Sequence, residues 1–292
     1  MTEGSVFELL RRDPRVRFDP HIAHAGLIYD DAARALLSEV HTAYIEIARR
    51  RGLPIIAFAD TWRASAERVA ASRFRGLNVN RDNVEFLRAI ARPSGARVFV
   101  GALMGPRGDA YRPEEAPSKA EALRYHAPQI DELTRAGAEM IIAATLPSFE
   151  EAKGIATLLA ATATPWMLSF VVRPTGLLLD GTPLEDAIRE IDGASSPPPA
   201  GFSINCVHPE IARQALSRLS DHARRRVIAF QGNTSARTPE ELDNLSRIDR
   251  AEAEPFARSV ATLMEESSIH IVGGCCGTDA EHMRAVADRF LQ

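Results

Sequence analysis

The sequence predicts an α/β fold, a (β/α)8 TIM barrel of parallel strands that forms a single domain over residues 1–292. Two observations support this fold: apolar segments alternate with amphipathic helix patterns, and most of those apolar segments are continuously hydrophobic. Continuous hydrophobicity is what a strand buried on both faces requires, and such strands occur in parallel sheets. The length of 292 residues suits one barrel. An open, doubly wound sheet is the alternative arrangement of the same units.

Seven segments have the pattern of a buried strand. In chain order they are residues 54–60, 97–105, 140–146, 165–173, 201–207, 225–233 and 269–276. An eighth and weaker candidate is VRFDP at residues 15–19, which would precede the others and makes the first unit atypical. Eight βα units are the number that closes a barrel.

Helices are predicted between these strands. Apolar residues at helical spacing form one stripe before residue 54, made by Leu36, Leu37, Val40, Tyr44, Ile47 and Ala48. Five later helix starts have the capping-box pattern, Ser or Thr followed three positions later by Glu. They are Ser118 with Glu121, Ser148 with Glu151, Thr182 with Glu185, Thr238 with Glu241 and Thr278 with Glu281. The long loop 105–117 follows a strand, so we expect it to cover the active face.

The composition excludes several classes of function. Hydrophobic residues make up 45% and charged residues 25%, as in ordinary folded proteins. The formal net charge of −4 gives no reason to expect nucleic acid or an anionic membrane as a partner. The chain has no apolar run suited to a secretion signal or a membrane span, and no strand is followed by a nucleotide-binding glycine motif. We therefore expect a cytoplasmic protein with small-molecule partners; its oligomeric state, including a homo-oligomer, stays open.

All three cysteines stand at the ends of predicted strands. Cys206 ends one strand, and the adjacent Cys275 and Cys276 end the last strand. In a barrel these are strands six and eight, so their sulfurs can meet above strand seven at the C-terminal face, where barrels carry their sites. Consecutive residues of a regular strand point to opposite faces, so a turn is needed for both neighbours to point inward. The flanking glycines allow such a turn, and they are Gly273, Gly274 and Gly277.

Three thiolates that face one point suit a tetrahedral zinc ion, with Zn–S distances of about 2.3 Å. Three protein ligands leave the fourth position open, which is the arrangement of a catalytic zinc site. A thiol substrate can fill that position and be held as a thiolate near neutral pH. The thiolate can attack the methyl group of an onium donor, and the protein must align the two. The sequence therefore predicts one Zn²⁺ on Cys206, Cys275 and Cys276, which are also the catalytic residues.

Two other interpretations of the cysteines are weaker. Buried cysteines are often small apolar core residues, but this does not explain three of them at strand ends beside a Gly-Gly-Cys-Cys-Gly motif. A redox role for the vicinal pair would leave Cys206 unexplained, and a disulfide between neighbours is strained.

The two cysteine segments, INCVHPE (204–210) and VGGCCGTDAEHMRAV (272–286), resemble the zinc motifs of the homocysteine S-methyltransferase family. The resemblance covers most of the chain and also includes residues 41–65, 101–111, 123–142 and 178–188. It implies a zinc-dependent barrel that moves a methyl group from a sulfonium, ammonium or folate donor to homocysteine, giving methionine. The implied donors are of the S-methylmethionine, S-adenosylmethionine or betaine type.

The sequence departs from the family pattern at two places. The family opens with a strand that ends in Asp-Gly; here Asp19 is expected to stand for the aspartate as a substrate-binding residue, with Pro20 after it. The family's fourth strand usually ends Phe-Glu-Thr, and its glutamate helps to hold the amino group of homocysteine. Here Ala144 replaces the glutamate and Thr145 is kept. One alternative function is therefore the same zinc chemistry on a different thiol, and another is a barrel that binds zinc or thiols without turnover.

Further substrate-binding candidates follow two other strands. Asp60, Thr61 and Trp62 close the segment where the family has an Asn-Thr pair and an aromatic residue. Asp60 is a candidate to bind an amine or a sulfonium, or else to cap the next helix, and Trp62 to face a methylated cation. Asn205 precedes Cys206 and is expected to support it by a hydrogen bond. Gln231, like Asn233, ends the strand beneath the metal and can contact substrate or water.

Four histidines lie near predicted strands or helices, and we expect different roles for them. His208 lies two residues beyond Cys206, but a loop or cap role fits it better than that of a fourth ligand. His21 and His24 lie near the weak first strand and are candidates to line the site. His126 lies in a predicted helix and is expected to be structural.

Overall fold

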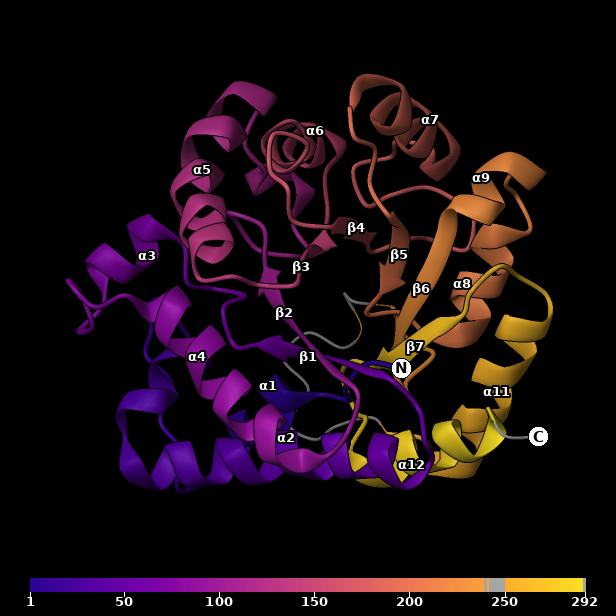
Figure 1. The fold of residues 1–292 in the computed structure, drawn as a ribbon. Helices are drawn as coiled ribbons and strands as arrows, with labels where there is room; N and C mark the ends of the chain where they lie inside the picture. The colour runs from indigo at the N-terminus through magenta and orange to yellow at the C-terminus, as the bar shows by residue number, and fades with distance from the viewer. Residues whose placement is uncertain (239–240, 242–249, 291–292) are drawn as a thin grey trace.

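The computed structural model describes residues 1–238, 241 and 250–290. It contains a parallel seven-stranded sheet in the order β1-β2-β3-β4-β5-β6-β7, so sequence neighbours are also spatial neighbours. The sheet curls with helices on its outer side (Figure 1). The strands are β1 (Ile55–Ala59), β2 (Val98–Met104), β3 (Met140–Leu146), β4 (Trp166–Phe170), β5 (Gly201–Asn205), β6 (Val227–Gly232) and β7 (Ile271–Gly274). Each falls inside a predicted segment, and the parallel order excludes a doubly wound sheet.

The gap between β7 and β1 is filled by the first three residues of the chain, here called the N-terminal strand (1–3). The amide of Thr2 donates to the carbonyl of Val272 at 2.7 Å, and the amide of Ile56 donates to Met1 at 3.0 Å. The amide of Gly274 donates to the carbonyl of Glu3 at 2.9 Å. In Figure 1 the N-terminus accordingly lies beside β7. These bonds complete the ring that the seven strands leave open.

The prediction that residues 15–19 form the first strand is wrong. Asp19 makes only an isolated antiparallel bridge with Ala23. The apolar side chains of Val16 and Phe18 pack instead on a small cluster that is separate from the main core. Its members are Leu10, Leu27, Ile28, Ala33 and Leu37. The N-terminal strand escaped the hydrophobicity pattern because it is only three residues long and carries two polar side chains.

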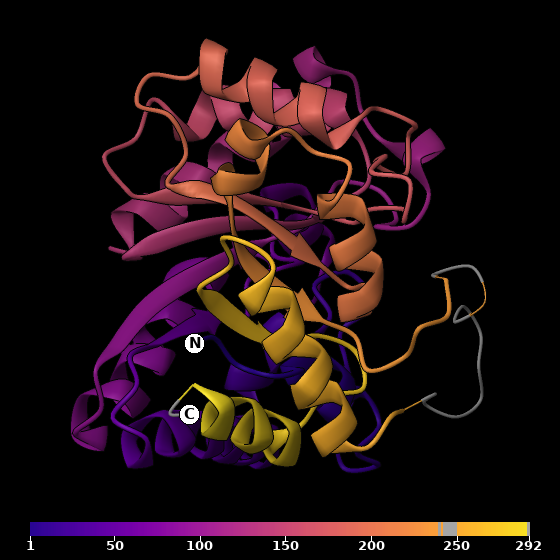
Figure 2. The same cartoon turned by 90° about the vertical axis from the view of Figure 1, so that its right-hand side faces the viewer.

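Helices surround the sheet and cover its outer face (Figures 1 and 2). The predicted stripe before β1 lies on α2 (Asp31–Arg50), whose Leu37, Tyr44, Ile47 and Ala48 are buried. The other α-helices are α1 (Val6–Arg11), α3 (Ala66–Ala71), α4 (Val79–Ala91), α5 (Lys119–Arg135), α6 (Phe149–Leu159), α7 (Leu184–Ala194), α8 (Pro209–Leu216), α9 (Asp221–Arg226), α11 (Ala253–Glu265) and α12 (Ala280–Arg289). Short 3-10 helices are η1 (His24–Tyr29), η2 (Arg92–Ser94) and η3 (Pro113–Glu115).

The five predicted capping boxes have different outcomes. Ser118 and Glu121 form a complete box at the start of α5, and Thr238 and Glu241 exchange the same pair of bonds. At the other three sites a neighbour or a distant partner takes over. Glu151 bonds to His126, Glu185 bonds to Ser220, and α12 is capped by Asp279 rather than Thr278. Tertiary contacts therefore replaced the predicted box at two sites, and an adjacent residue replaced it at the third.

The side chains of β1 are divided between two apolar clusters. On β1, Ile55, Ala57 and Ala59 belong to the large core between the sheet and the helices. Phe58 points to the other face and packs with residues of β3, β4 and β6 in a smaller cluster inside the barrel. Continuous hydrophobicity thus reflects burial on both faces. Among the described residues, no helix is long and apolar enough to cross a membrane.

Candidate metal centre and its cavity

The three cysteines meet at the C-terminal end of the barrel, above β6. Cys206 directly follows β5, and its amide donates to the carbonyl of Gln231 at 3.0 Å. Cys275 follows β7, and its amide donates to Gly232 at 2.7 Å. The two segments thus continue the sheet from either side of β6. As a result, the sulfurs of Cys206, Cys275 and Cys276 all lie within 4.8 Å of one another.

The structure joins Cys206 and Cys275 by a disulfide, with their Cα atoms 5.6 Å apart, while Cys276 keeps a free thiol. The pairing is therefore between strands and not between the vicinal cysteines. Burial raises the pKa of the Cys276 thiol to about 12, and the nearby carboxylate of Glu8 adds to the shift. Arg11 and Arg12 act in the opposite direction but do not offset this rise, so without a metal ion the thiol is protonated at neutral pH.

The sulfur set fits a zinc ion once the disulfide is reduced. Sulfurs around a tetrahedral zinc with bonds of about 2.3 Å lie roughly 3.8 Å from one another, and the three atoms here lie within 4.8 Å. Thiolate is also the ligand type that zinc prefers in sites of this kind. Cys206, Cys275 and Cys276 are thus the residues able to hold the metal.

Asn233, one residue beyond β6, ties the two cysteine segments together. Its side-chain amide donates to the carbonyl of Cys206 at 2.9 Å, and its side-chain oxygen accepts from the amide of Cys276 at 3.1 Å. One buried side chain therefore uses both of its polar atoms to hold the Cys206 and Cys276 segments together, although these segments are distant in sequence. Asn233 was predicted to lie beneath the metal and to contact substrate or water. In the structure its side chain instead bonds to the backbone of Cys206 and Cys276.

The glycines beside the cysteines serve close approach more than turning. Only Gly277 has a positive φ, of 83°. A methyl group on Gly273 would collide with the hydroxyl of Thr2, and one on Gly274 would collide with Thr278. The Thr278 hydroxyl in turn donates to the carbonyl of Cys275 at 2.7 Å. The glycines thus allow the N-terminal strand and Thr278 to pack against the segment that carries Cys275 and Cys276.

Asn205 links Cys206 to the end of β3. Its side chain accepts from the amide of Thr145 at 3.0 Å and donates to the Thr145 hydroxyl at 2.8 Å. It also donates to the sulfur of Cys206 at 3.4 Å, the supporting hydrogen bond that the sequence predicted. Thr145 and Cys206 both have positive φ, of 62° and 55°, which is rare for residues with a side chain. Such strain persists only where surrounding contacts fix the backbone, and here Asn205 supplies them.

A cavity of about 370 Å³ opens beside the sulfurs. Its wall includes eight of the predicted site residues, among them Cys206, Cys275, Cys276, Asp60, Trp62, Thr145 and Asn205. Gln231 lines it as well, and its side-chain amide donates to the hydroxyl of Thr2 at 3.3 Å. Phe58 and Ala144, from the apolar cluster inside the barrel, also contribute to the wall. The cavity therefore lies between the sulfurs and the barrel interior.

Two carboxylates and two histidines form a buried chain at this cavity. His41 on α2 places Nδ1 at 2.6 Å from Glu3 Oε1 and Nε2 at 2.9 Å from Asp60 Oδ2. The other oxygen of Asp60 lies 3.2 Å from Nε2 of His24. Glu3 is fixed further by the amide of Phe58 at 2.9 Å. The chain Glu3–His41–Asp60–His24 is called the acid–histidine chain below.

The charges in this chain are set by its two carboxylates. Burial alone lowers the pKa of His41, but Glu3 and Asp60 outweigh that effect and raise the pKa to about 10. Burial alone raises the pKa of Asp60, but His41 and His24 hold it well below its usual range. At neutral pH an imidazolium at His41 therefore stands between two carboxylates.

The aromatic and cationic part of the cavity wall includes residues for which the sequence predicted no role. Arg63 stacks on the ring of Trp62, with Cζ at 4.9 Å from the centroid. Its guanidinium donates to the carbonyls of Pro106 and Gly108, both at 2.9 Å, and so braces the loop 105–117. Tyr111 from the same loop lines the cavity. This confirms that the long loop covers the site, and shows that a protein cation already occupies one face of Trp62.

Two predicted substrate-binding residues lie outside the cavity wall. Asp19 uses its carboxylate to accept from the amides of His21 and Ile22, at 2.8 and 3.2 Å. The position expected of Asp19, the end of the first strand, is held by Glu3. Thr61 is fully buried and donates to the carbonyl of Leu103 at 2.6 Å.

The remaining histidine predictions are resolved by local contacts. His208 caps α8 by accepting from the amide of Glu210, and it does not belong to the sulfur group. His126 is buried against Glu151 at 2.8 Å, which confirms a structural role. His24 lines the cavity, as expected, while His21 does not. The sequence signal for Glu3 is the Glu3-Gly4 pair, which is similar to the Asp-Gly of the family but follows only two residues instead of a long apolar run.

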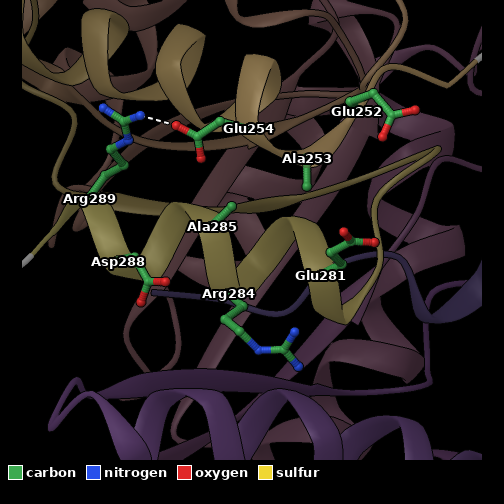
Figure 3. Close-up of a pocket in the computed structure, with 8 residues that line it drawn as sticks. All are labelled: Glu252, Ala253, Glu254, Glu281, Arg284, Ala285, Asp288 and Arg289. Atoms are coloured by element: carbon green, nitrogen blue, oxygen red, sulfur yellow. Dashed lines mark hydrogen bonds and ion pairs between the residues drawn. The ribbon is translucent and has the colours of Figure 1, made fainter.

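A second cavity, of about 470 Å³, lies between α11 and α12 in the outer helix layer (Figure 3). Its lining is mostly charged and includes the ion pair of Arg289 with Glu254. It shares no lining residue with the cysteine cavity, and Figure 3 shows its charged side chains spread over two helices rather than converging on one point. The cysteine cavity is therefore the candidate site.

The sequence comparisons agree on one family. A model of the family "Homocysteine S-methyltransferase" matches residues 4–290. The chain is 28% identical over 207 residues to homocysteine S-methyltransferase from Escherichia coli (strain K12), and 27% identical over 196 residues to homocysteine S-methyltransferase YbgG from Bacillus subtilis (strain 168). These alignments cover 68% and 65% of this chain, but only 64% and 60% of the relatives.

The structural comparison confirms the barrel. The homocysteine methyltransferase MmuM from Escherichia coli matches in its metallated form with a TM-score of 0.78 and 23% identity, over 99% of this chain and 96% of that one. Its oxidized form matches with a TM-score of 0.77 and 24% identity, over 99% and 94%. At this identity the likeness establishes the fold.

Proposed function

Because this chain belongs to the homocysteine S-methyltransferase family, we propose that it transfers a methyl group from an onium donor to a thiol held at a zinc ion. Homocysteine is the first candidate for the thiol, which makes methionine the product. S-methylmethionine, S-adenosylmethionine and betaine are the candidate donor types. The observation that carries this proposal is the cluster of three sulfurs within 4.8 Å, at the mouth of a cavity large enough for small substrates.

The residues of the chain divide the work between metal, acceptor and donor. When bound, zinc would supply the positive charge that keeps an acceptor sulfur deprotonated near neutral pH. Cys206, Cys275 and Cys276 would hold it, and Asn233 would keep their backbones in place. Aromatic rings line the cavity and suit a methylated cation; they belong to Phe7, Trp62 and Tyr111. The cavity would thus hold donor and acceptor close together and exclude water.

Metal analysis tests the first step of this proposal. Protein purified under reducing conditions is expected to contain about one zinc per chain. Cys206→Ser and Cys276→Ser should each lower zinc affinity by at least about tenfold, because an alcohol is a far weaker zinc ligand than a thiolate. Thr157→Ala, on the exposed face of α6, serves as the matched control and should keep full metal content. A folded, reduced wild type that binds no zinc would remove the basis of the mechanism.

A substrate panel tests the second step. Zinc-loaded protein is incubated with each of the three donors and with homocysteine or other thiols, and the methylated product is measured by mass spectrometry. Homocysteine should be the best acceptor. Faster methylation of another thiol would instead favour the alternative acceptor that Ala144 suggests, since a carboxylate is missing at that position of the cavity wall. Tight binding of zinc and thiols with no methyl transfer from any donor would favour a binding protein without turnover.

A further inference from the structure

The cysteine cluster offers three sulfur ligands and no ligand of another kind. The sulfurs lie within 4.8 Å of one another, and in the part of the chain that the structure describes no histidine, aspartate or glutamate joins the group with a fourth ligand atom. Two segments supply the sulfurs: Cys206 follows β5, and Cys275 and Cys276 follow β7. The protein therefore provides a three-ligand site made of sulfur alone.

The three sulfurs also share one open side. All three cysteines line the same cavity of about 370 Å³, so an atom bonded to their sulfurs faces that cavity. Cys206 and Cys275 are near enough to be joined directly, which shows that their two segments let the sulfurs approach as closely as a bound atom requires. Such a site suits an atom that forms three bonds to sulfur on one side and needs no ligand on the other.

Trivalent arsenic has this bonding pattern. It forms three bonds in a pyramid and keeps a lone pair on the fourth side, whereas zinc is tetrahedral and needs a fourth ligand there. Thiolate is a soft ligand and selects soft acceptors. The complex of trivalent arsenic with three thiolates is also uncharged, while zinc with the same ligands carries a net negative charge. Because burial of a charge is costly unless it is compensated, the neutral complex needs less support from the protein.

We propose that the reduced site binds a trivalent metalloid oxyacid, represented by arsenite, through Cys206, Cys275 and Cys276. Each thiol gives its proton to one hydroxyl of arsenous acid, which leaves as water. Three S–H and three As–O bonds are thus replaced by three As–S and three O–H bonds, and arsenic stays trivalent. The Cys206–Cys275 disulfide is first reduced by a phosphine, which becomes the phosphine oxide with oxygen from water. The proposal involves neither a methyl donor nor an acceptor thiol, so it stands or falls independently of the proposed function.

The mass of the complex tests the number of As–S bonds. The chain has three cysteines in all, so every thiol that reacts belongs to this site. The reduced, metal-free chain is mixed with an equimolar amount of arsenite and measured by native mass spectrometry. Binding by three sulfurs should add one arsenic atom, remove three hydrogens and leave no thiol that reacts with a disulfide reagent. A complex that keeps a hydroxyl on arsenic and a reactive thiol, or no complex at all, would overturn the proposal.

A variant and a second arsenical assign the third bond to Cys276. Cys276→Ser should bind arsenite at least about a hundredfold more weakly, because one arm of a chelate is lost. Phenylarsine oxide forms only two bonds to sulfur, so Cys206 and Cys275 suffice for it and its affinity should not change. Its retention also shows that the variant is folded at the site. Thr157→Ala, on the exposed face of α6, is the matched control and should bind both arsenicals as the wild type does. Equal affinity of wild type and Cys276→Ser for arsenite would refute the three-sulfur site.

Competition tests whether arsenite and zinc use the same sulfurs. Zinc-loaded protein is titrated with arsenite while a dye reports free zinc. One zinc should be released for each arsenite bound, since both need the same three ligands. Binding of arsenite without release of zinc would place it elsewhere and overturn the proposal. If reduced protein takes up no zinc, the proposed function fails, and the measurements of mass and of Cys276→Ser still decide this inference.

Discussion

At the scale of single residues, His41 is a buried histidine held between two acidic side chains. It is fully buried and lies between Glu3 of the N-terminal strand and Asp60 after β1. Removing one member of a buried ionic group leaves its partners without compensation, which costs far more than breaking a surface pair. In this chain the partners are two carboxylates that would then face each other across the vacated space.

We predict that His41→Gln destabilises the protein by about 3–5 kcal/mol, because two buried carboxylates lose their shared cation. The free energy of unfolding is measured at pH 7 by denaturation with urea, because urea is uncharged and does not screen the charges of the protein. His222→Gln, an exposed histidine on α9, is the control and should change it by less than about 0.5 kcal/mol. A small effect at His41 would mean that the carboxylates take up protons or water instead.

The same group predicts how stability depends on pH. The pKa of His41 is raised from its usual value of 6.5 to about 10 in the folded protein. Its contribution is therefore complete below pH 6.5 and is lost as pH rises through about 10. The difference in unfolding free energy between wild type and His41→Gln should shrink steadily over that interval. A constant difference from pH 6 to pH 10 would show that His41 is neutral when folded.

At the scale of elements, the contact between the N-terminal strand and β7 both closes the barrel and lies next to the segment that carries Cys275 and Cys276. Gly273 lies so close to Thr2 and Glu3 that a Cβ has no room. Gly273→Ala should therefore push the N-terminal strand outward, lower the unfolding free energy by about 1–3 kcal/mol, and weaken zinc binding as Gly274 loses its bond to Glu3.

Gly193, near the end of α7, is the matched control for this prediction, because a Cβ there meets nothing within 4 Å. Gly193→Ala should be neutral or slightly stabilising, since alanine restricts the unfolded chain more than glycine does. Thermal denaturation and zinc titration of both variants distinguish steric conflict from a general effect of the substitution. Equal behaviour of the two variants would show that β7 can move to accommodate the methyl group.

Elements with a strong local signal were predictable from sequence, and the exceptions share one cause. β3 was predicted at residues 140–146 and found there, because its apolar run is long and bounded. The three cysteines were placed at strand ends for the same reason. Glu3 and Arg63 were missed because their roles depend on contacts with distant residues, His41 and the carbonyls of Pro106 and Gly108. The local pattern of a sequence does not show which distant residues a side chain will contact in the fold.

At the scale of the whole molecule, the barrel is closed by bonds between the two ends of the sequence. The N-terminal strand pairs with β7 and β1, and α12 packs on α2. Removing residues 1–5 would break this closure and leave His41 with one carboxylate partner fewer. We expect the truncated chain to melt at a lower temperature, by roughly 10 °C or more if several kcal/mol are lost, and to lose zinc in the same transition. Scanning calorimetry with a zinc-sensitive dye follows both events, and retention of metal beyond melting would argue against the coupling.

The three cysteines that could hold a metal ion are brought together by the same closure. Cys206 and Cys275 are 69 residues apart and approach only because β5, β6 and β7 lie in register. A site built this way has no counterpart in an unfinished chain, unlike a zinc finger whose ligands are neighbours. During synthesis on the ribosome, metal capture would therefore be a late event that marks completion of the ring. If cobalt replaced zinc, the visible absorption of the bound ion would appear only when the barrel had closed. The absorption could therefore be used to follow barrel assembly over time.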